Sequence, residues 1–151
     1  FVRETKARLE ADYINTGKVR FVYRDFPLVD IHAGALLAAH VANCAGDQGA
    51  YWPMHDQLFG GTSARSWGSG DASDFSTFLG YAAGLQLDTQ QLDQCVRANK
   101  YADQIEADFR EAAALGVRST PSFVVNGQLL VGAQPFEIWQ ELLDKLLAEQ
   151  K

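Results

Sequence analysis

The chain has 151 residues, of which 47% are hydrophobic, so it is long enough to form one domain with a sizeable core. Its 13 basic and 19 acidic residues give a net charge of -6, which argues against a surface built to bind nucleic acid. No uninterrupted apolar run approaches the roughly 18 residues that indicate a membrane-spanning helix, and we expect no membrane span in these residues.

The first part of the chain predicts a helix followed by a strand. Apolar side chains recur among charged residues over residues 1–15, and Gly17 follows as a helix stop. Residues 19–23 form a short run that is rich in β-branched and aromatic side chains, and Pro27 follows it. This pattern is typical of a strand.

The middle of the chain, residues 32–116, predicts a block of helices without a convincing strand. We expect helices over residues 32–45, 51–59 and 101–115, and two more that begin at caps near Asp71 or Ser73 and near Asp88 or Thr89. Residues 60–72 are rich in Gly and Ser, which predicts a loop.

Strands return near the C-terminus. Residues 122–125 and 128–131 are apolar, and Asn126-Gly127 between them is the strongest short signal for a hairpin. Pro135 is placed to begin a final helix with one apolar stripe. The predicted order is therefore helix, strand, helical block, hairpin and helix.

Thr120-Pro121 opens the hairpin. A proline is tolerated at the start of a strand, and most such bonds are trans, since only about 5–6% of X-Pro bonds in folded proteins are cis. However, the order Thr-Pro, apolar strand, Asn-Gly, a strand ending at Gly132, then a helix resembles the C-terminal half of the thioredoxin fold. In that fold the proline is cis and faces the redox cysteines.

Several other stretches narrow the resemblance to the DsbA-like thiol-disulfide oxidoreductases, whose mark is a helical insertion. The matching stretches are Thr16 to Phe21, Arg24-Asp25-Phe26-Pro27-Leu28, Gln48-Gly49 with Tyr51-Trp52 and Met54-His55, and Ala114 to Val117. The resemblance implies an α/β, thioredoxin-like fold with an inserted all-helical subdomain. Residues 1–30 and 117–151 would form the thioredoxin-like domain, and residues 31–116 the helical insertion.

Members of this family carry a Cys-x-x-Cys pair at the start of the first helix, and this sequence has none. The chemistry needs two close thiols, one of them acidic. Because residues 1–15 look like the later part of that helix, we expect a chain truncated just after the motif, without the first strand of the fold. We expect that strand to come from an upstream segment, another chain or a rearrangement, because the sheet would otherwise have open edges.

The two cysteines, Cys44 and Cys95, lie in the helical block, which is the wrong place for the redox pair. The resemblance implies a structural disulfide between them, which would indicate an oxidising compartment. The alternatives are two separate buried thiols, or a metal site with His40 or His55, whose spacings match no common zinc pattern. We expect no metal and no cofactor.

The other candidate side chains have structural interpretations. Three histidines lack a neighbour arranged for nucleophilic catalysis: His32, His40 and His55. We expect the aromatic cluster to be core: Tyr51, Trp52 and Phe59. We expect Asp25 to be a surface or loop carboxylate, although it could perturb a thiol in the complete protein. We expect one acidic set to be a solvated helix face: Glu106, Asp108 and Glu111.

The resemblance implies a protein thiol-disulfide oxidoreductase that acts on cysteine-containing polypeptides and exchanges electrons with a redox partner protein. Its substrates would bind at Ser119, Thr120 and Pro121, with Pro121 in the cis form. It would work outside the cytoplasm, in the bacterial periplasm, at the cell surface, secreted or anchored through the missing N-terminal part. The alternative is a redox-inactive peptide-binding or chaperone-like module, and a glutathione-using enzyme is a weaker third hypothesis. The sequence does not distinguish an oxidase from a reductase or an isomerase.

Overall fold

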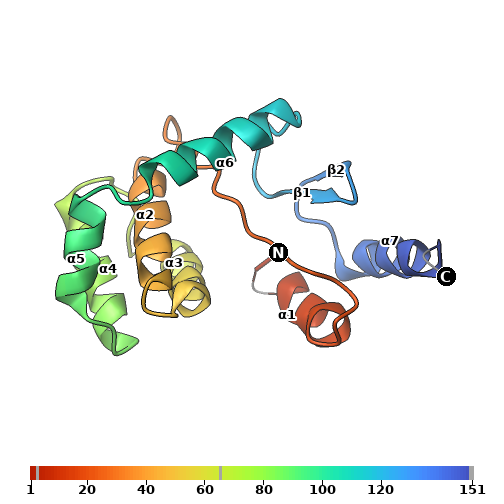
Figure 1. The fold of residues 1–151 in the computed structure, drawn as a ribbon, viewed down its shortest axis with the longest axis horizontal. Coiled ribbons are helices and arrows are strands. Elements are labelled where there is room, and N and C mark those ends of the chain that lie inside the picture. The colour runs from red at the N-terminus through yellow and green to blue at the C-terminus, as the bar shows by residue number, and fades with distance from the viewer. Residues whose placement is uncertain (3, 65, 150–151) are drawn as a thin grey trace. The chain divides into compact units, whose positions relative to one another are not determined.

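The computed structural model describes residues 1–2, 4–64 and 66–149 (Figure 1). The chain divides into two compact units, and it enters and leaves the second unit once. Unit 1 comprises Phe1–Tyr23 and Ala113–Lys151, and unit 2 comprises Arg24–Ala112.

Unit 1 is built from the two ends of the chain. Its elements are helix α1 (Thr5–Leu9), the π-helical turn η1 (Glu10–Ile14), strands β1 (Ser122–Val125) and β2 (Gln128–Val131), and helix α7 (Phe136–Glu149). Unit 2 is helical, with α2 (Ala35–Gly46), α3 (Tyr51–Ala64), α4 (Ala72–Gly84), α5 (Thr89–Arg97) and most of α6 (Ala102–Ala114).

The core of unit 1 forms where α1, η1 and α7 pack with the hairpin. Leu9 and Tyr13 from the N-terminal helices are buried against three residues of α7: Phe136, Trp139 and Leu143. The N-terminal helices end near Gly17, which adopts a φ of 74°, a conformation that glycine reaches without steric cost. Two segments from opposite ends of the chain therefore share one hydrophobic cluster.

The hairpin is antiparallel, and Val125 pairs with Gln128 across the two turn residues. Asn126 and Gly127 both have positive φ, at 47° and 86°, as the tight turn of a two-residue hairpin requires. Phe123 and Val125 contact the hydrophobic cluster, whereas Val124, on the opposite face of the strand, is exposed. The sequence prediction of this hairpin is confirmed.

The expected strand over residues 19–23 is wrong. Among the residues that the structure describes, the sheet contains only β1 and β2. Side-chain exposure nevertheless alternates along this segment. Arg20 and Val22 are exposed, whereas Val19, Phe21 and Tyr23 are half-buried. A strand needs a neighbour to bond its backbone, and no described strand lies beside this segment. The segment therefore has the side-chain alternation of a strand, but no described strand forms backbone hydrogen bonds with it.

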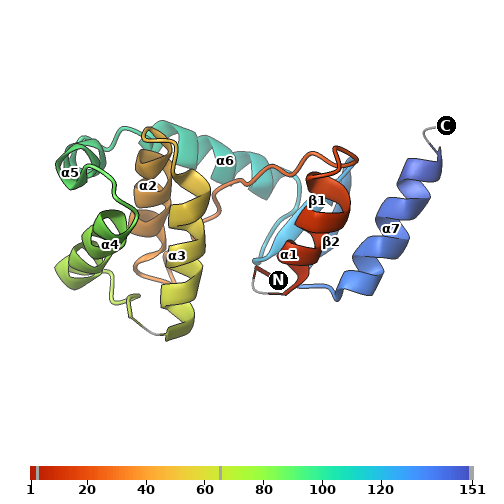
Figure 2. The same cartoon turned by 90° about the horizontal axis from the view of Figure 1, so that it is seen from below.

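Unit 2 packs around α2, which contacts α3, α4 and α5 and lies alongside α3 (Figure 2). Its most deeply buried large side chains include Val41, Met54, Phe78 and Leu92, one from each of these four helices. The predicted helix caps are present: Asp71 accepts from the Ser73 N–H, and the Asp88 side chain accepts from the N–H groups of the two residues after Thr89.

The loop expected over residues 60–72 begins later than predicted, because α3 continues to Ala64. Gly60 and Gly61 weaken a helix in isolation. Here Gly61 lies so close to α4 that any side chain would clash with the Tyr81 hydroxyl. Close packing between the two helices therefore overrides the low helix propensity of glycine.

Candidate functional site

The segment before β1 presents Ser119, Thr120 and Pro121, and all three residues are exposed. The Thr120–Pro121 peptide bond is cis. The Ser122 hydroxyl donates to the Ser119 carbonyl oxygen at 2.7 Å, and the Gly132 N–H donates to the Pro121 carbonyl oxygen at 2.8 Å. These two bonds fix both sides of Thr120, for which no hydrogen bond to a described residue is found.

One edge of β1 is open. In an antiparallel hairpin, the N–H and C=O groups of alternate residues face the partner strand. The residue pair that flanks a two-residue turn is a bonded pair, so Val125 and Phe123 face β2, and the Pro121 carbonyl continues this row. Ser122 and Val124 therefore direct their backbone groups to the other edge, where no strand pairs with β1 among the described residues.

An aromatic cluster packs against β1 through Phe123. The Phe123 ring contacts the rings of Trp139 and Phe1, with centroid distances of 4.6 Å in both cases. The Phe1 ring centroid also lies 6.5 Å from that of Phe21, so Phe1 neighbours both β1 and the segment that follows Gly17. Burial of these rings anchors β1, and thereby the Thr120–Pro121 segment at its start.

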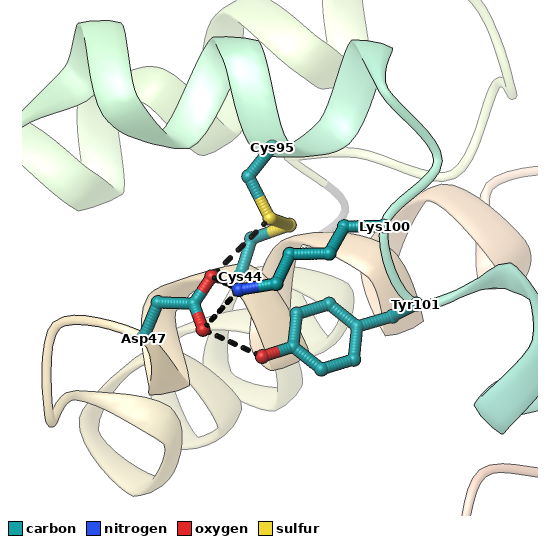
Figure 3. A network of polar contacts seen from close by, with 5 residues as sticks. All are labelled: Cys44, Asp47, Cys95, Lys100 and Tyr101. Atoms are coloured by element: carbon teal, nitrogen blue, oxygen red, sulfur yellow. Dashed lines mark hydrogen bonds and ion pairs between the residues drawn. A yellow bond between two sulfur atoms is a disulfide. The ribbon is translucent and has the colours of Figure 1, made fainter.

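The two cysteines form a disulfide in unit 2, as the resemblance implied (Figure 3). Cys44 lies in the last turn of α2 and is 1% exposed, and its Cα lies 5.9 Å from that of Cys95 on α5. Since these are the only cysteines in the sequence, the chain has no free thiol. The separate-thiol and zinc alternatives for this pair are thereby excluded.

A polar network covers the disulfide (Figure 3). Both carboxylate oxygens of Asp47 lie 2.7 Å from Lys100 Nζ, and Tyr101 donates its hydroxyl to the same carboxylate at 2.7 Å. These bonds from Lys100 and Tyr101 lower the pKa of Asp47. Cys95 Sγ lies 3.6 Å from Asp47 Oδ2, but a disulfide sulfur carries no proton to donate, so this is a contact only. The ion pair of Asp47 and Lys100 therefore joins residues beside the disulfide, and both sulfur atoms stay bonded to each other.

Two carboxylates are buried in unit 2. Asp108 is 5% exposed, so its expected place on a solvated helix face is wrong, whereas Glu106 and Glu111 are exposed as expected. Asp25 lies outside the helices and strands, as expected of a loop carboxylate, but it is 6% exposed and therefore not at the surface. The side chain of Asn43 donates to Asp25 Oδ2 at 2.7 Å. A helical signal was available for Asp108, because it lies three residues after the buried Ile105 and on the same helix face. Asp25 gave no such signal.

The three histidines differ in exposure and in their contacts. His40 and His55 are buried and His32 is exposed. Burial lowers the pKa of His40, and His55 Nδ1 lies 2.9 Å from Asp56 Oδ1. Among the described residues, no three metal-ligating side chains come together.

The aromatic cluster on α3 departs from the expectation of a buried core. Tyr51 packs against the core of unit 2, but Trp52 and Phe59 are each 39% exposed. Their rings flank His55, at centroid distances of 5.3 and 4.7 Å. The helix directs Met54 and Leu58 to the core. Trp52, two positions before Met54, and Phe59, one position after Leu58, therefore lie on another side of the helix.

Relatives of known sequence include Na(+)/H(+) antiporters. NhaA 1 of Salinispora arenicola (strain CNS-205) is 36% identical over 129 residues, which are 85% of this chain and 18% of that protein. NhaA 3 of Salinispora tropica is 36% identical over 110 residues, 73% of this chain and 16% of that protein. The chain thus spans less than a fifth of the length of these relatives. None of the helices in the described part of the chain combines the length and apolar character needed to cross a membrane.

Two solved structures resemble the whole chain. The crystal structure of Wolbachia pipientis alpha-DsbA1 gives a TM-score of 0.80 at 26% identity, covering 99% of this chain and 78% of that chain. A variant of the same protein with two cysteines replaced by alanine gives a TM-score of 0.81 at 25% identity, with coverage of 99% and 78%. A family model described as thioredoxin matches residues 1–145. The chain therefore belongs to the thioredoxin family and is a DsbA-like protein with the thioredoxin fold.

Proposed function

We propose that this chain is the substrate-binding part of a DsbA-like thiol-disulfide oxidoreductase that acts on cysteine-containing polypeptides. The observation that carries the proposal is the exposed Thr120–Pro121 segment beside the open edge of β1. An extended polypeptide can pair with such backbone groups by strand addition, whatever its side chains. This mode suits an enzyme that must accept many unrelated substrates.

The exchange reaction needs a thiol pair that this chain does not hold. The thiolate of one cysteine of the pair attacks one sulfur of a disulfide, which forms a mixed disulfide and releases the other sulfur as a thiolate. The second cysteine of the pair, as a thiolate, then attacks the sulfur of the first cysteine and releases the remaining sulfur of the other molecule, so that the pair ends as a disulfide. One disulfide is reduced to two thiols while another forms, so electrons balance between protein and substrate. Cys44 and Cys95 are already bonded to each other and lie in unit 2. The proposal therefore requires a Cys-x-x-Cys pair outside these 151 residues and a redox partner protein that restores the oxidation state of that pair.

The working compartment is extracytoplasmic. The disulfide between Cys44 and Cys95 supports this assignment, because such bonds persist mainly in oxidising compartments. The antiporter relatives do not lead us to propose ion transport. The family model accounts for residues 1–145 as thioredoxin, and the alignment covers 18% of the first antiporter. We propose that the matched region of those proteins is a thioredoxin-like part as well.

The test uses the full-length protein that contains this chain. The protein is incubated with a peptide that carries a disulfide, quenched with acid and analysed by mass spectrometry for mixed disulfides. We expect a peptide adduct on a cysteine outside these residues, while Cys44 and Cys95 stay bonded to each other. A gene with no Cys-x-x-Cys shortly before the codon for Phe1 contradicts the proposal.

A redox-inactive peptide-binding module is the second candidate, and the lack of any free thiol favours it. The module would use the same open edge of β1 but perform no exchange. Two probes on the full-length protein distinguish the two functions: a cysteine-free unfolded peptide measures binding, and the disulfide-carrying peptide measures thiol exchange. Binding without any exchange activity supports the module, and exchange activity supports the enzyme.

A further inference from the structure

A cluster of side chains ties the first residues of unit 2 to α6. Arg24 Nη1 lies 3.0 Å from Asp108 Oδ1, and the backbone N–H of Asp25 donates to Asp108 Oδ2 at 3.3 Å. The Phe26 ring stacks on Phe109, with a centroid distance of 4.4 Å and an interplanar angle of 11°. Three consecutive residues of the connecting segment are thus held by two consecutive residues of α6.

The polar part of this cluster is closed off from water. Asp25 and Asp108 are buried, and the amide of Asn43 donates both to Asp25 Oδ2 at 2.7 Å and to the Ala39 carbonyl oxygen at 2.9 Å. Gln104 on α6 donates in turn to Asn43 Oδ1 at 3.5 Å. The segment, α2 and α6 therefore meet around one pair of carboxylates.

The charges in the cluster do not balance. Asp108 from α6 faces Asp25, and α2 contributes the uncharged Asn43. The guanidinium of Arg24 bonds Asp108, and the Arg24 side chain is 57% exposed. Two buried carboxylates thus share one half-exposed cation. A buried charge without a partner is costly, and a neighbouring charge of the same sign adds to the cost.

This imbalance favours a proton on Asp25. Burial raises the pKa of its carboxyl to about 6, the bond from Asn43 opposes this rise, and the charge of Asp108 adds to it. Asp25 therefore changes its charge between mildly acidic and neutral pH. The other groups of the cluster that carry charge, Arg24 and Asp108, are paired with each other.

The cluster also lies where the chain passes between its units. Unit 2 begins at Arg24, and it ends at Ala112, within the same helix that holds Asp108. Both links between the units thus start from residues of this cluster or close to it. The first link joins Tyr23 of unit 1 to Arg24 of unit 2. Release of residues 24–26 from α6 would therefore lengthen the part of this link that is not held by α6.

We propose that residues 24–26 form a pH-dependent latch on α6, which is closed while Asp25 is protonated and opens more often when both carboxylates are charged. Opening exposes Asp25 to water and relieves its repulsion with Asp108. The stacked Phe26 and Phe109 rings keep the closed state as the major one at either pH. The proposal is independent of the thiol chemistry proposed above, since it concerns only side chains in unit 2.

Amide hydrogen exchange of the Asp25 N–H tests the latch, because this proton is bonded to Asp108 only in the closed state. After correction for intrinsic rates, we expect its opening constant to rise about tenfold between about pH 5 and pH 8, as linkage to a carboxyl of this pKa requires. Low concentrations of urea should hardly change it, because a local opening exposes little surface. In Asp25→Asn the opening constant should not depend on pH. Asp30→Asn, which removes an exposed carboxylate of the same unit, should behave like wild type.

Two results would overturn the latch. In the first, the Asp25 amide exchanges with the same opening free energy and urea dependence as the Phe78 and Leu92 amides of the core, so that it opens only when the whole unit unfolds. In the second, the pH dependence persists in Asp25→Asn. Should that variant fail to fold, a carbon-13 NMR titration of the wild-type Asp25 carboxyl decides, because its midpoint must coincide with that of the opening.

Discussion

The hydroxyl of Tyr13 donates a hydrogen bond to Asp144 Oδ1 at 2.8 Å, which joins the N-terminal helices of unit 1 to α7. Tyr13 is buried, whereas Asp144 is exposed and can be solvated when the bond is lost. We therefore expect Tyr13→Phe to lower the free energy of unfolding by about 1 kcal/mol, the usual contribution of one such bond. Urea unfolding followed by circular dichroism measures this. A loss of several kcal/mol would show that the hydroxyl does more than bind Asp144.

The same pair predicts a response at alkaline pH. Burial, and next the bond to Asp144, raise the pKa of Tyr13 from 10.0 to about 12. Since the folded pKa is raised, the stability due to the protonated hydroxyl is complete below about pH 10 and is lost as the pH rises through about 12. Ultraviolet absorbance of tyrosinate should show, besides the titration of Tyr101, whose pKa is raised by its bond to Asp47, one titration near pH 12 in wild type. This titration should be absent in Tyr13→Phe and shifted to lower pH in Asp144→Asn, which keeps the acceptor but loses its charge.

Asp74 holds the loop before α4, and its removal should destabilise unit 2. Its carboxylate accepts from the N–H groups of Gly68, Ser69 and Gly70 and from the Ser69 hydroxyl, at 2.7–3.3 Å. Burial alone would raise the pKa of Asp74, but the bonds from Gly68, Gly70 and Ser69 outweigh it, and the pKa is lowered. We expect Asp74→Ala to lower the free energy of unfolding by about 2–4 kcal/mol, because several donors lose their partner at once.

A matched control for this change lies three residues earlier. Asp71 caps α4 but is exposed, so Asp71→Ala should cost less than Asp74→Ala. The contribution of Asp74 is present above its unfolded pKa and is lost as the pH falls through the lower folded value. The two alanine variants should therefore differ in stability at neutral pH and converge in strong acid. Equal stabilities at neutral pH would contradict the anchoring role of Asp74.

The disulfide should stabilise unit 2 mainly by restricting the unfolded chain. Cys44 and Cys95 are 51 residues apart, and closing a loop of this size is worth about 4 kcal/mol on the chain-entropy model. We expect the double change Cys44→Ala and Cys95→Ala to reduce the stability by about this amount. Wild type under reducing conditions is the control, because it keeps both side chains and loses only the bond. A reduced protein as stable as the oxidised one would show that the bond adds nothing.

Asp25 should make the protein less stable at neutral pH than in mild acid. Its pKa is raised from 3.8 to about 6 by burial and by Asp108, against the opposing bond from Asn43. The stability due to its protonated form is complete below about pH 4 and is lost as the pH rises through about 6. Asp25→Asn should therefore be roughly 2–3 kcal/mol more stable than wild type at about pH 8 and similar to it at about pH 4. Urea unfolding at both pH values, with Asp30→Asn as the control, measures the difference.

Features coded by neighbouring residues could be predicted from the sequence. Asn126-Gly127 specifies a two-residue turn through its positive φ angles, and the caps at Asp71 and Asp88 bond N–H groups two or three residues away. The family resemblance likewise depends on short motifs, around Thr120-Pro121 and at several other places along the chain, taken in their order. Each turn, cap or short motif depends on residues that are close together in the sequence, so it can be recognised without knowledge of the tertiary fold.

Features that depend on distant partners could not be predicted. Residues 19–23 have the alternation of a strand, but a ladder needs a second strand, and none lies beside them among the described residues. The backbone N–H of Asp25 bonds to Asp108, 83 positions along the chain, so no local pattern indicates the environment of Asp25. Gly61 is helical because Tyr81 of another helix packs against it. In all three cases the deciding contact comes from elsewhere in the fold.

Peptide binding at the open edge of β1 should depend on the backbone of Thr120 more than on its side chain. Thr120 is exposed, and no hydrogen bond to a described residue is found for it, so Thr120→Pro removes a donor without breaking a known internal bond. We expect this change to weaken the binding of extended peptides to the full-length protein by about tenfold, the value of one lost hydrogen bond of about 1.4 kcal/mol. Calorimetry measures the affinity, and circular dichroism checks that the variant is folded.

The control for this change is Ala133→Pro, which places a proline in another exposed part of unit 1, after β2. The two variants add the same residue type at similar exposure, but only Thr120 lies beside the open edge of β1. If substrates add a strand to this edge, Ala133→Pro binds peptides like wild type and Thr120→Pro does not. Equal affinities of both variants for peptides would place the binding surface elsewhere on the molecule, because a lost edge donor must weaken backbone pairing.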